Sequence, residues 1–254
     1  MKPQKELRNT VACRIFFKEL LQSNLFVNTD GSSVLVTPTG ASCNKLFGVG
    51  EVKETEKRGK ITKIKLSDMT ATLNVYTAKA FHVESGVFLA FVAKLHVRAN
   101  TGKGILMIVE EAASVAESVR DTEILTTAKR TMERVELLRN ITLTKNELSN
   151  GVDHAENALR EPVKHYAIDD DKLDALVEMA INAVKGVWQH HNKTTKELVL
   201  DVLGKAGNSS MDRMELMSKL EKRGLLEEWI EQIIEELIEE GLCYEPEVGA
   251  VKVV

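Results

Sequence analysis

Charged and aromatic side chains recur at alternate positions in three short segments, and they are the residues best suited to bind another molecule. They are Lys63, Lys65, Tyr76, Lys94, His96 and Arg98, together with Lys103 in a glycine-containing loop. Residues two apart point to the same side of a β-strand, so the members of each segment share a face. Cationic groups contact phosphates and bases stack on flat rings, so this pattern predicts a site for single-stranded nucleic acid. Tyr76 is the first stacking candidate and His96 the second; the alternative for each residue is an ordinary exposed strand position.

Five short segments with strand character must position these side chains. They cover residues 46–52, 61–66, 71–77, 87–98 and 105–109. The alternation of apolar and polar residues is clearest in segment 87–98, where the odd positions are apolar and the last three even positions are polar. Polar and glycine-containing stretches at 67–70 and 100–104 are typical of hairpin turns. Five strands joined in this way predict an all-β barrel of the OB type.

The segments before and between these strands are less regular. Residues 14–24 fit either a strand or a helix, and residues 25–40 predict an N-terminal hairpin or arm packed on the barrel. Residues 53–60, KETEKRGK, are predicted to form a charged loop between the first two strands. That loop either faces solvent or contacts phosphates at the rim of the site.

Apolar periodicity predicts a helix at residues 121–139, with Asp121 or Thr122 as its N-terminal cap. One stripe gathers its apolar residues, which are Ile124, Ala128, Met132, Val135 and Leu138. Such a stripe either packs on the barrel of its own chain or stays exposed until a second subunit covers it. We predict the second arrangement, a subunit interface.

The C-terminal part of the sequence predicts a helical domain. Residues 140–171 are polar and predict a linker, and helical periodicity then runs from 172 to 188. Three further helices are predicted at residues 194–204, 211–220 and 227–240. A β-hairpin is predicted after them, at residues 242–253. Three helices and a hairpin predict a winged-helix domain of the α+β class. The predicted domains are therefore 1–139, 140–171 and 172–254.

Positive and negative residues are unevenly distributed along the 254-residue chain, although its net charge is only −4. Residues 1–110 carry 16 Lys and Arg against nine Asp and Glu, whereas residues 193–254 carry eight against 14. The predicted helix at 227–240 holds seven glutamates and no Lys or Arg. Polyanions are bound chiefly through cations that release counterions, so this helix is unsuited to reading duplex DNA. We predict a surface there that docks another protein, made by Glu228, Glu231, Glu235 and Tyr244.

The sequence lacks the motifs that several classes of enzyme need. The chain contains no Gly-rich phosphate loop ending in Lys-Ser/Thr, no His-Glu-x-x-His and no Gly-x-Ser-x-Gly. We therefore predict a non-enzyme without catalytic residues, metal or cofactor. The three cysteines show no ligand spacing and are expected to be reduced thiols of an intracellular protein. No long apolar run and no secretory leader are found, so no membrane association is expected.

Two stretches resemble a known family. Leu66–Thr72 (LSDMTAT) with Asn74–Tyr76 is similar to the second and third strands of the OB fold in the middle-sized subunit of replication protein A. Phe91–Glu111 is similar to the fourth and fifth strands there, and a helix and a small helical domain follow in the same order. Arg14–Gly40 resembles the N-terminal stretch of archaeal replication-protein-A-associated proteins. The resemblance covers most of the chain.

The resemblance implies a subunit that binds single-stranded DNA in replication, repair and recombination, in the cytoplasm and associated with the nucleoid. It implies a heterotrimer with a large and a small subunit, joined through the helix at 121–139, and a winged helix that docks other replication or repair proteins. The chain departs from the family where stacking aromatics are expected, at about Ala78 and Ala99. Two alternatives stay open: an assembly scaffold with little direct DNA contact, and a winged-helix transcription regulator whose barrel is a sensor or dimerisation domain.

Overall fold

The structure, a computed structural model, describes residues 11–29, 32–79, 82–98, 104–144, 154–205, 207 and 209–254. The chain forms two compact units, Met1–Val184 and Lys185–Val254. They are called the N-terminal unit and the C-terminal unit below. No helix in the described ranges combines the length and the apolar character needed to cross a membrane.

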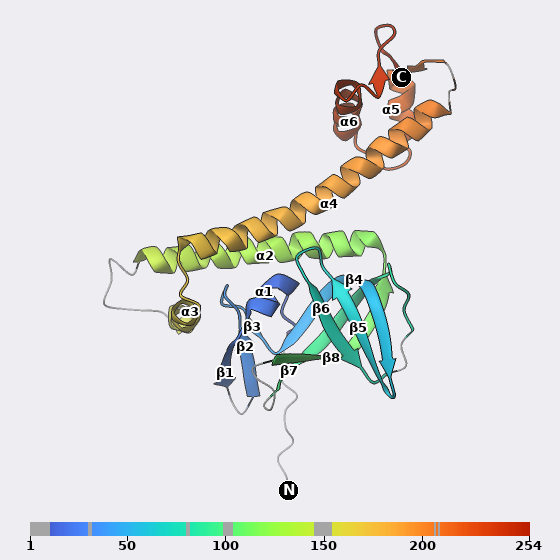
Figure 1. Cartoon of the computed structure of the whole chain (residues 1–254). Coiled ribbons are helices and arrows are strands. Elements are labelled where there is room, and N and C mark those ends of the chain that lie inside the picture. Colours follow the sequence, from blue (N-terminus) through green and yellow to red (C-terminus); the bar gives the residue numbers. More distant parts are fainter. Residues whose placement is uncertain are drawn as a thin grey trace. The chain divides into compact units, whose positions relative to one another are not determined.

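Five strands close into a barrel in the N-terminal unit (Figure 1). They are β4 (Lys45–Arg58), β5 (Ile61–Ser67), β6 (Thr72–Thr77), β7 (Phe88–Arg98) and β8 (Gly104–Val115). The order around the barrel is β4-β5-β6-β8-β7, because the first half of β4 pairs with β7 and its second half with β5. β6 and β8 are parallel and meet at Tyr76 and Ile108, whereas the other neighbours are antiparallel. The predicted five-stranded barrel is confirmed, although β4 and β8 are longer than predicted.

The charged segment at 53–60 is not a loop, so that prediction is wrong. β4 continues through Arg58; after a register shift between Val52 and Glu54 it pairs with β5 from Glu54 to the last pair, Arg58 and Ile61. Charged side chains are compatible with a strand here because the β4 side chains from 53 to 58 are exposed to solvent, apart from the partly buried Glu56. Gly59 has φ +62°, which a two-residue turn of this kind requires at its first position.

The interior of the barrel receives a phenylalanine from outside the sheet. Cys13 forms an isolated bridge with Leu46, and residues 14–24, which fitted either a strand or a helix, contain the short helix α1 (Phe17–Gln22). Phe17 is 1 % exposed and its ring centroid lies 6.1 Å from that of Phe91 on β7. The N-terminal arm therefore completes the core that the five strands enclose.

Two glycines of β4 leave room for the Phe17 ring. A Cβ atom on Gly50 would lie 3.1 Å from Leu66 Cβ and 3.2 Å from a carbon of the Phe17 ring. Both neighbours are fully buried and have little freedom to move. Gly50→Ala is therefore expected to lower the free energy of unfolding of the N-terminal unit by about 1–3 kcal/mol in urea denaturation. Gly204→Ala, whose Cβ would meet nothing within 4 Å, is the control; equal stability of the two variants would contradict the packing argument.

A small sheet precedes the barrel, as predicted for residues 25–40. It contains β1 (Leu25–Thr29), β2 (Ser32–Val36) and β3 (Ser42–Cys43) in that order. β1 and β2 form the hairpin, with Leu25 opposite Val36. Leu35 and Cys43 are buried in the barrel core, so this sheet is packed on the barrel rather than free of it.

The helix after the barrel, α2 (Glu117–Thr144), is longer than predicted and packs along β4 and β7 (Figure 1). Four residues of its apolar stripe, Ile124, Ala128, Val135 and Leu138, are 0–5 % exposed. The prediction of a subunit interface is wrong for these four, because the chain's own structure already covers them. Met132 is the exception at 41 % exposed. The predicted cap is also wrong, since the helix begins before Asp121 and Thr122.

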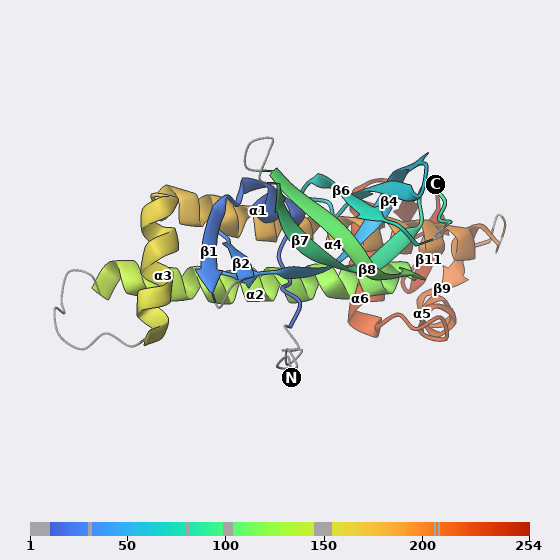
Figure 2. The same cartoon turned by 90° about the horizontal axis from the view of Figure 1, so that it is seen from below.

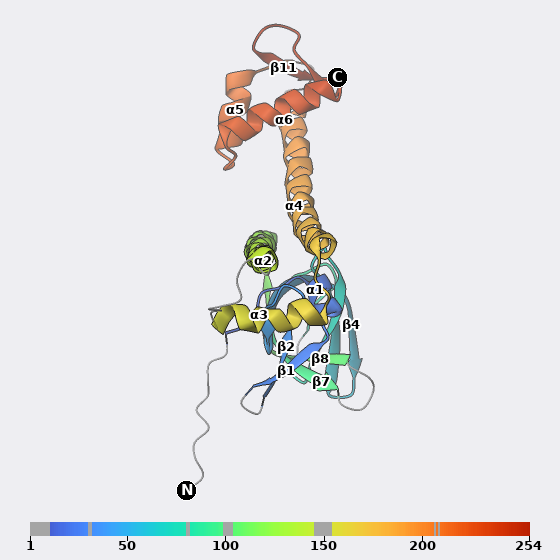
Figure 3. The same ribbon diagram turned by 90° about the vertical axis from the view of Figure 1, so that its left-hand side faces the viewer.

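The described part of residues 140–171 is folded and is not a linker. It contains the end of α2 and the helix α3 (His154–His165), which runs across the direction of α2 (Figures 2 and 3). The Tyr166 hydroxyl donates to Val36 O (2.6 Å) and accepts from Leu25 N (3.0 Å). These hydrogen bonds tie the segment to the β1–β2 hairpin. The long helix α4 (Asp170–Gly204) follows, and the boundary between the two units lies inside it, not at residue 171.

The C-terminal unit contains the end of α4 and a small α+β arrangement. Its elements are β9 (Met211–Asp212), α5 (Arg213–Glu221), α6 (Glu227–Glu239), β10 (Cys243–Tyr244) and β11 (Ala250–Val253). The strands form one antiparallel sheet in the order β10-β11-β9, and the helices supply most of the buried core. The predicted helices at 211–220 and 227–240 and the terminal hairpin are present. The predicted helices at 172–188 and 194–204 are one continuous helix, α4.

An ion-pair cluster in this unit predicts a dependence of stability on pH. Lys196 Nζ on α4 lies 2.7 Å from Glu236 Oε2 on α6, and Asn192 Nδ2 donates to the same oxygen at 3.0 Å. The hydrogen bond from Lys196 is the main reason why the pKa of Glu236 falls from 4.5 to about 2. A carboxyl group with a lowered pKa in the folded state stabilises that state above its ordinary pKa. This stabilisation is lost as the pH falls from about 4.5 towards 2.

The change that tests this is Glu236→Gln. Urea denaturation followed by tryptophan fluorescence gives the free energy of unfolding of the C-terminal unit. This free energy should fall between about pH 5 and pH 2 in the natural chain, and it should fall less in the variant. Both tryptophans of the chain, Trp188 and Trp229, lie in this unit. Identical pH profiles for the two proteins would contradict the assigned role of Glu236.

Candidate nucleic-acid interface

Cross-strand pairing brings the predicted binding residues of different strands into one row on the outside of the barrel. Partners directly opposite each other share a face of the sheet. The pairs, taken in order, are Lys45 with Lys94, Lys94 with Ile108, Ile108 with Tyr76, Tyr76 with Lys63, and Lys63 with Glu56. This row is called the outer row below. It crosses β7, β8, β6 and β5 and ends on the two halves of β4.

The centre of the outer row is apolar. Tyr76 is partly buried, and Ile108 beside it is 39 % exposed. A tyrosine ring beside an aliphatic side chain forms a flat apolar platform, and Lys63 and Lys94 lie on its two sides. Such an arrangement can stack a base and hold the phosphates next to it.

Two lysines on the outer surface of the barrel are available to an anion. Lys65 and Lys94 are exposed, and neither forms an ion pair within 4 Å with any residue that the structure describes. Lys65 lies opposite Asn74, next to the outer row. These two ammonium groups are therefore the cations of the face that a phosphate can neutralise without displacing a carboxylate.

Other cations of the face already have acidic partners. Lys63 Nζ lies 3.8 Å from Glu56 Oε2, and Lys45 Nζ lies 2.7 Å from Glu110 Oε2. Arg58 Nε donates to Glu56 Oε1 at 2.7 Å, and this hydrogen bond is the main cause of the lowered pKa of Glu56. Exposed pairs of this kind are weak, so phosphates can compete for the cations, but the positive potential of the face is reduced.

The remaining predicted residues belong to the end of the β7–β8 hairpin. His96 is exposed and lies opposite Leu106, two residues further along β7 than Lys94. Arg98 ends β7 and its backbone pairs with Gly104; its side chain and the whole of Lys103 lie outside the described residues. Lys63, Lys65, Tyr76, Lys94 and His96 thus all belong to the outer surface of the barrel. Lys63, Lys65 and Tyr76 lie together on the neighbouring strands β5 and β6, whereas Lys94 and His96 lie on β7, on the other side of β8.

Sequence reasoning missed three members of the outer row, Lys45, Ile108 and Glu56. Ile108 could have been found, because in the run 105–109 the period of two places it on the outward side. Lys45 could not, because its place beside Lys94 depends on the register of β4 and β7. Of the two positions where the family has aromatics, Ala78 is exposed and Ala99 lies outside the described residues.

No cluster of three or more His, Cys, Asp or Glu side chains that could hold a metal ion occurs within the described ranges. The acidic face predicted for docking lies in the C-terminal unit. Glu228 and Glu235 are exposed on α6, and Tyr244 on β10 is 40 % exposed. Glu231 is partly buried and lies 3.8 Å from the Arg213 guanidinium, so part of its charge is compensated within the unit.

The strand order and the closure define an OB-like barrel followed by a helix. No protein-family model matches the chain, and neither does any curated protein sequence. Solved structures do align with it. A chain of a replication protein A heterotrimer bound to ssDNA aligns at 13 % identity and a TM-score of 0.41, over 49 % of this chain and 98 % of that chain. A chain of the S. pombe Stn1–Ten1 complex aligns at 11 % identity and a TM-score of 0.37, over 55 % of this chain and 100 % of that chain.

A third solved structure also aligns with the chain. The OBody NL8, bound to hen egg-white lysozyme, aligns at 15 % identity and a TM-score of 0.26, over 29 % of this chain and 94 % of that chain. All three TM-scores are below 0.5, so we base no functional conclusion on them.

Proposed function

We propose that this chain binds single-stranded DNA through the outer row of its barrel, as one subunit of a replication-protein-A-like complex. The observation that supports the proposal is the register of the strands, in which Tyr76 and Ile108 lie between Lys63 and Lys94 along the outer row. Binding of a single strand without sequence preference needs this combination of flat apolar surface and cations. Lys65 and His96 extend the cationic path, and Arg98 and Lys103 are proposed to continue it along the β7–β8 hairpin.

The tyrosine provides the first test. Tyr76→Ala is expected to weaken binding of a labelled oligo-dT by about 1–3 kcal/mol, the contribution of one stacked base. Tyr76→Phe keeps the ring and should bind nearly as well as the natural chain. Fluorescence anisotropy gives the affinities, and far-UV circular dichroism confirms that each variant is folded. Equal loss in the two variants would show that the hydroxyl, and not the ring, matters; no loss in either would exclude Tyr76 from the site.

The unpaired lysines provide the second test, through the salt dependence of binding. Each phosphate contact on a single strand contributes about 0.7 to the slope of log K against log salt concentration. Lys65→Gln combined with Lys94→Gln should therefore reduce the slope by about 1.4. Lys219→Gln in the C-terminal unit removes a lysine that is paired with Glu215, and it should leave the slope unchanged. A double variant with the natural slope would place the DNA elsewhere.

The finer parts of the proposal concern the assembly. We propose the position of the middle-sized subunit in an archaeal heterotrimer that acts in replication, repair and recombination close to the nucleoid. The exposed residue of the α2 stripe, Met132, remains a candidate contact with the large and small subunits. We propose that the C-terminal unit is a winged helix that docks other replication or repair proteins through Glu228, Glu231, Glu235 and Tyr244.

A scaffold function is the second candidate, and the charge pairing on the barrel favours it. Glu56 and Glu110 already neutralise three of the cations near the outer row, and Ala78 offers no ring for stacking. A scaffold would bind oligo-dT only weakly when alone and tightly after its partner subunits are added. Titration of oligo-dT with the chain alone and with co-purified subunits therefore distinguishes the two functions. A preference for duplex DNA would instead support a transcription regulator.

A further inference from the structure

Two of the three cysteines lie next to each other in the N-terminal unit, although 30 positions separate them in the sequence. Cys13 precedes α1 and forms a bridge with Leu46 at the start of β4, and Cys43 belongs to β3. A single carbonyl oxygen, that of Lys45, accepts from Cys13 N at 2.8 Å and from Cys43 Sγ at 3.3 Å. The two thiols also lie within hydrogen-bonding reach of each other. The fold has therefore placed two sulfur atoms within reach of one another.

The environments of the two thiols are different. Cys13 is partly exposed, and its pKa is lowered by the hydrogen bond from Cys43 and by the nearby guanidinium groups of Arg134 and Arg130. Cys43 is fully buried, and its pKa is raised by the same hydrogen bond and by its burial. Thiolate character and access together make a cysteine reactive. Cys13 combines the lower pKa with partial access, whereas Cys43 is buried and has the higher pKa.

We propose that Cys13 and Cys43 are a site of reversible disulfide formation, in which Cys13 attacks the oxidant and Cys43 resolves the product. The oxidant is a hydroperoxide, with hydrogen peroxide as the simplest member of the class. The proposal is independent of DNA binding, because Lys45 contributes only its backbone carbonyl to the cysteine pair and no side chain of the outer row takes part.

The chemistry has two balanced steps. The Cys13 thiolate attacks one peroxide oxygen, the O–O bond breaks, and the leaving hydroxide takes up a proton to become water, which gives a Cys13 sulfenic acid. The Cys43 sulfur then attacks the Cys13 sulfur; the S–S bond forms, the S–O bond breaks, and the hydroxyl leaves as water with the proton of the Cys43 thiol. Two thiols are oxidised by two electrons in total, and one hydrogen peroxide is reduced to two waters. A dithiol reductant reverses the process.

The bond would join the N-terminal arm to the sheet that it packs on. Cys13 lies four residues before Phe17, which the arm inserts into the barrel. A covalent link there closes a loop in the chain and so lowers the conformational entropy of the unfolded state. Oxidation is therefore expected to stabilise the N-terminal unit rather than disrupt it.

Mass spectrometry of the full chain tests the assignment of the two roles. After treatment with hydrogen peroxide, peptide mapping without reductant should show a peptide that links Cys13 to Cys43, while Cys243 stays reduced, since it is buried and burial raises its pKa. Cys43→Ser and Cys43→Ala should accumulate a dimedone adduct on Cys13. Cys13→Ser should give no adduct on Cys43. Preferential oxidation of Cys243, or a link between two chains in place of the internal one, would overturn the proposal.

Thermal unfolding supplies a second, independent readout. The oxidised chain should have a Tm about 5–10 °C above that of the reduced chain, and dithiothreitol should reverse the shift. Cys243→Ser should keep the shift, and Cys13→Ser, Cys43→Ser and Cys43→Ala should each abolish it. A shift that survives in Cys13→Ser, or an oxidised chain with an unchanged Tm, would refute the site.

Discussion

Arg134→Ala is expected to lower the free energy of unfolding of the N-terminal unit by about 3–5 kcal/mol, because it leaves a buried carboxylate without its countercharge. That carboxylate belongs to Glu19 of α1, which is 0 % exposed. Arg134 Nη2 lies 3.6 Å from Glu19 Oε2, an oxygen that has no hydrogen-bond partner among the described residues. Arg134 Nε also donates to Thr39 Oγ1 at 2.7 Å, and Thr39 Oγ1 donates to Glu19 Oε1 at 2.5 Å.

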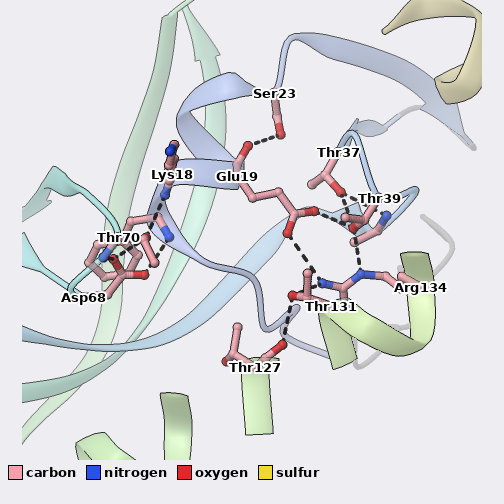
Figure 4. A network of polar contacts seen from close by, with 12 residues as sticks. Lys18, Glu19, Ser23, Thr37, Thr39, Asp68, Thr70, Thr127, Thr131 and Arg134 are labelled. Atoms are coloured by element: carbon pink, nitrogen blue, oxygen red, sulfur yellow. Dashed lines mark hydrogen bonds and ion pairs between the residues drawn. The ribbon is translucent and has the colours of Figure 1, made fainter. Parts of the chain in front are cut away.

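This network joins three parts of the N-terminal unit (Figure 4). Glu19 comes from α1, Thr39 from the turn between β2 and β3, and Arg134 from α2. Removal of the arginine affects all three contacts at once, which is why the expected loss is larger than for an exposed ion pair of about 0–1 kcal/mol. Arg139→Ala is the matched control, since Arg139 lies on the same helix and its partner Asp174 is largely exposed.

Urea denaturation followed by far-UV circular dichroism measures the effect. A double variant, Glu19→Gln with Arg134→Met, removes both charges and should recover part of the stability lost in Arg134→Ala. If Arg134→Ala and Arg139→Ala are equally stable, or if the double variant is no better than the single one, the network does not hold the unit together as described.

Phe17→Ala is also expected to lower the free energy of unfolding of the N-terminal unit by about 3–5 kcal/mol, because it leaves a cavity at the centre of the barrel. The ring is 1 % exposed and packs against Phe91 and the backbone of Gly48 and Gly50. The glycines cannot collapse into the space, since they carry no side chain that could turn towards it. Little relaxation is therefore available, which places the expected loss at the upper end for large-to-small changes.

A graded series separates loss of packing from loss of the arm. Phe17→Leu keeps most of the volume and should cost less than about 1.5 kcal/mol. In both variants the tryptophan signal of the C-terminal unit should keep its denaturation midpoint, because Trp188 and Trp229 lie in that unit. A Phe17→Ala protein as stable as Phe17→Leu would mean that the arm does not complete the core.

The period-two alternation of apolar and polar residues was sufficient to predict the barrel. Each strand carries its own pattern of inward and outward positions, and that pattern follows from backbone geometry alone. The same local information predicted the hairpin at residues 25–40 and the helices α5 and α6. The alternation also predicted which side chains point away from the barrel core, because the side of a strand on which a side chain lies depends only on its position along that strand. These residues are Lys63, Lys65, Tyr76, Lys94 and His96.

Local patterns failed where a segment has two possible partners. The apolar stripe of α2 has the same periodicity whether its own barrel or another chain covers it, and the structure buries Ile124 and Leu138 within the chain. The polar segment at 140–171 looked like a linker because few apolar residues mark it. Tyr166 nevertheless ties it to the β1–β2 hairpin by hydrogen bonds, which composition does not reveal.

The sequence by itself determined the class of the barrel, the division of charge along the chain and the side of each strand on which its cations lie. Only the tertiary structure decided that Tyr76 meets Ile108, that Phe17 enters the barrel and that Cys13 lies beside Cys43. The physical reason is that alternation depends on neighbouring residues, whereas register and packing depend on which distant surfaces fit each other.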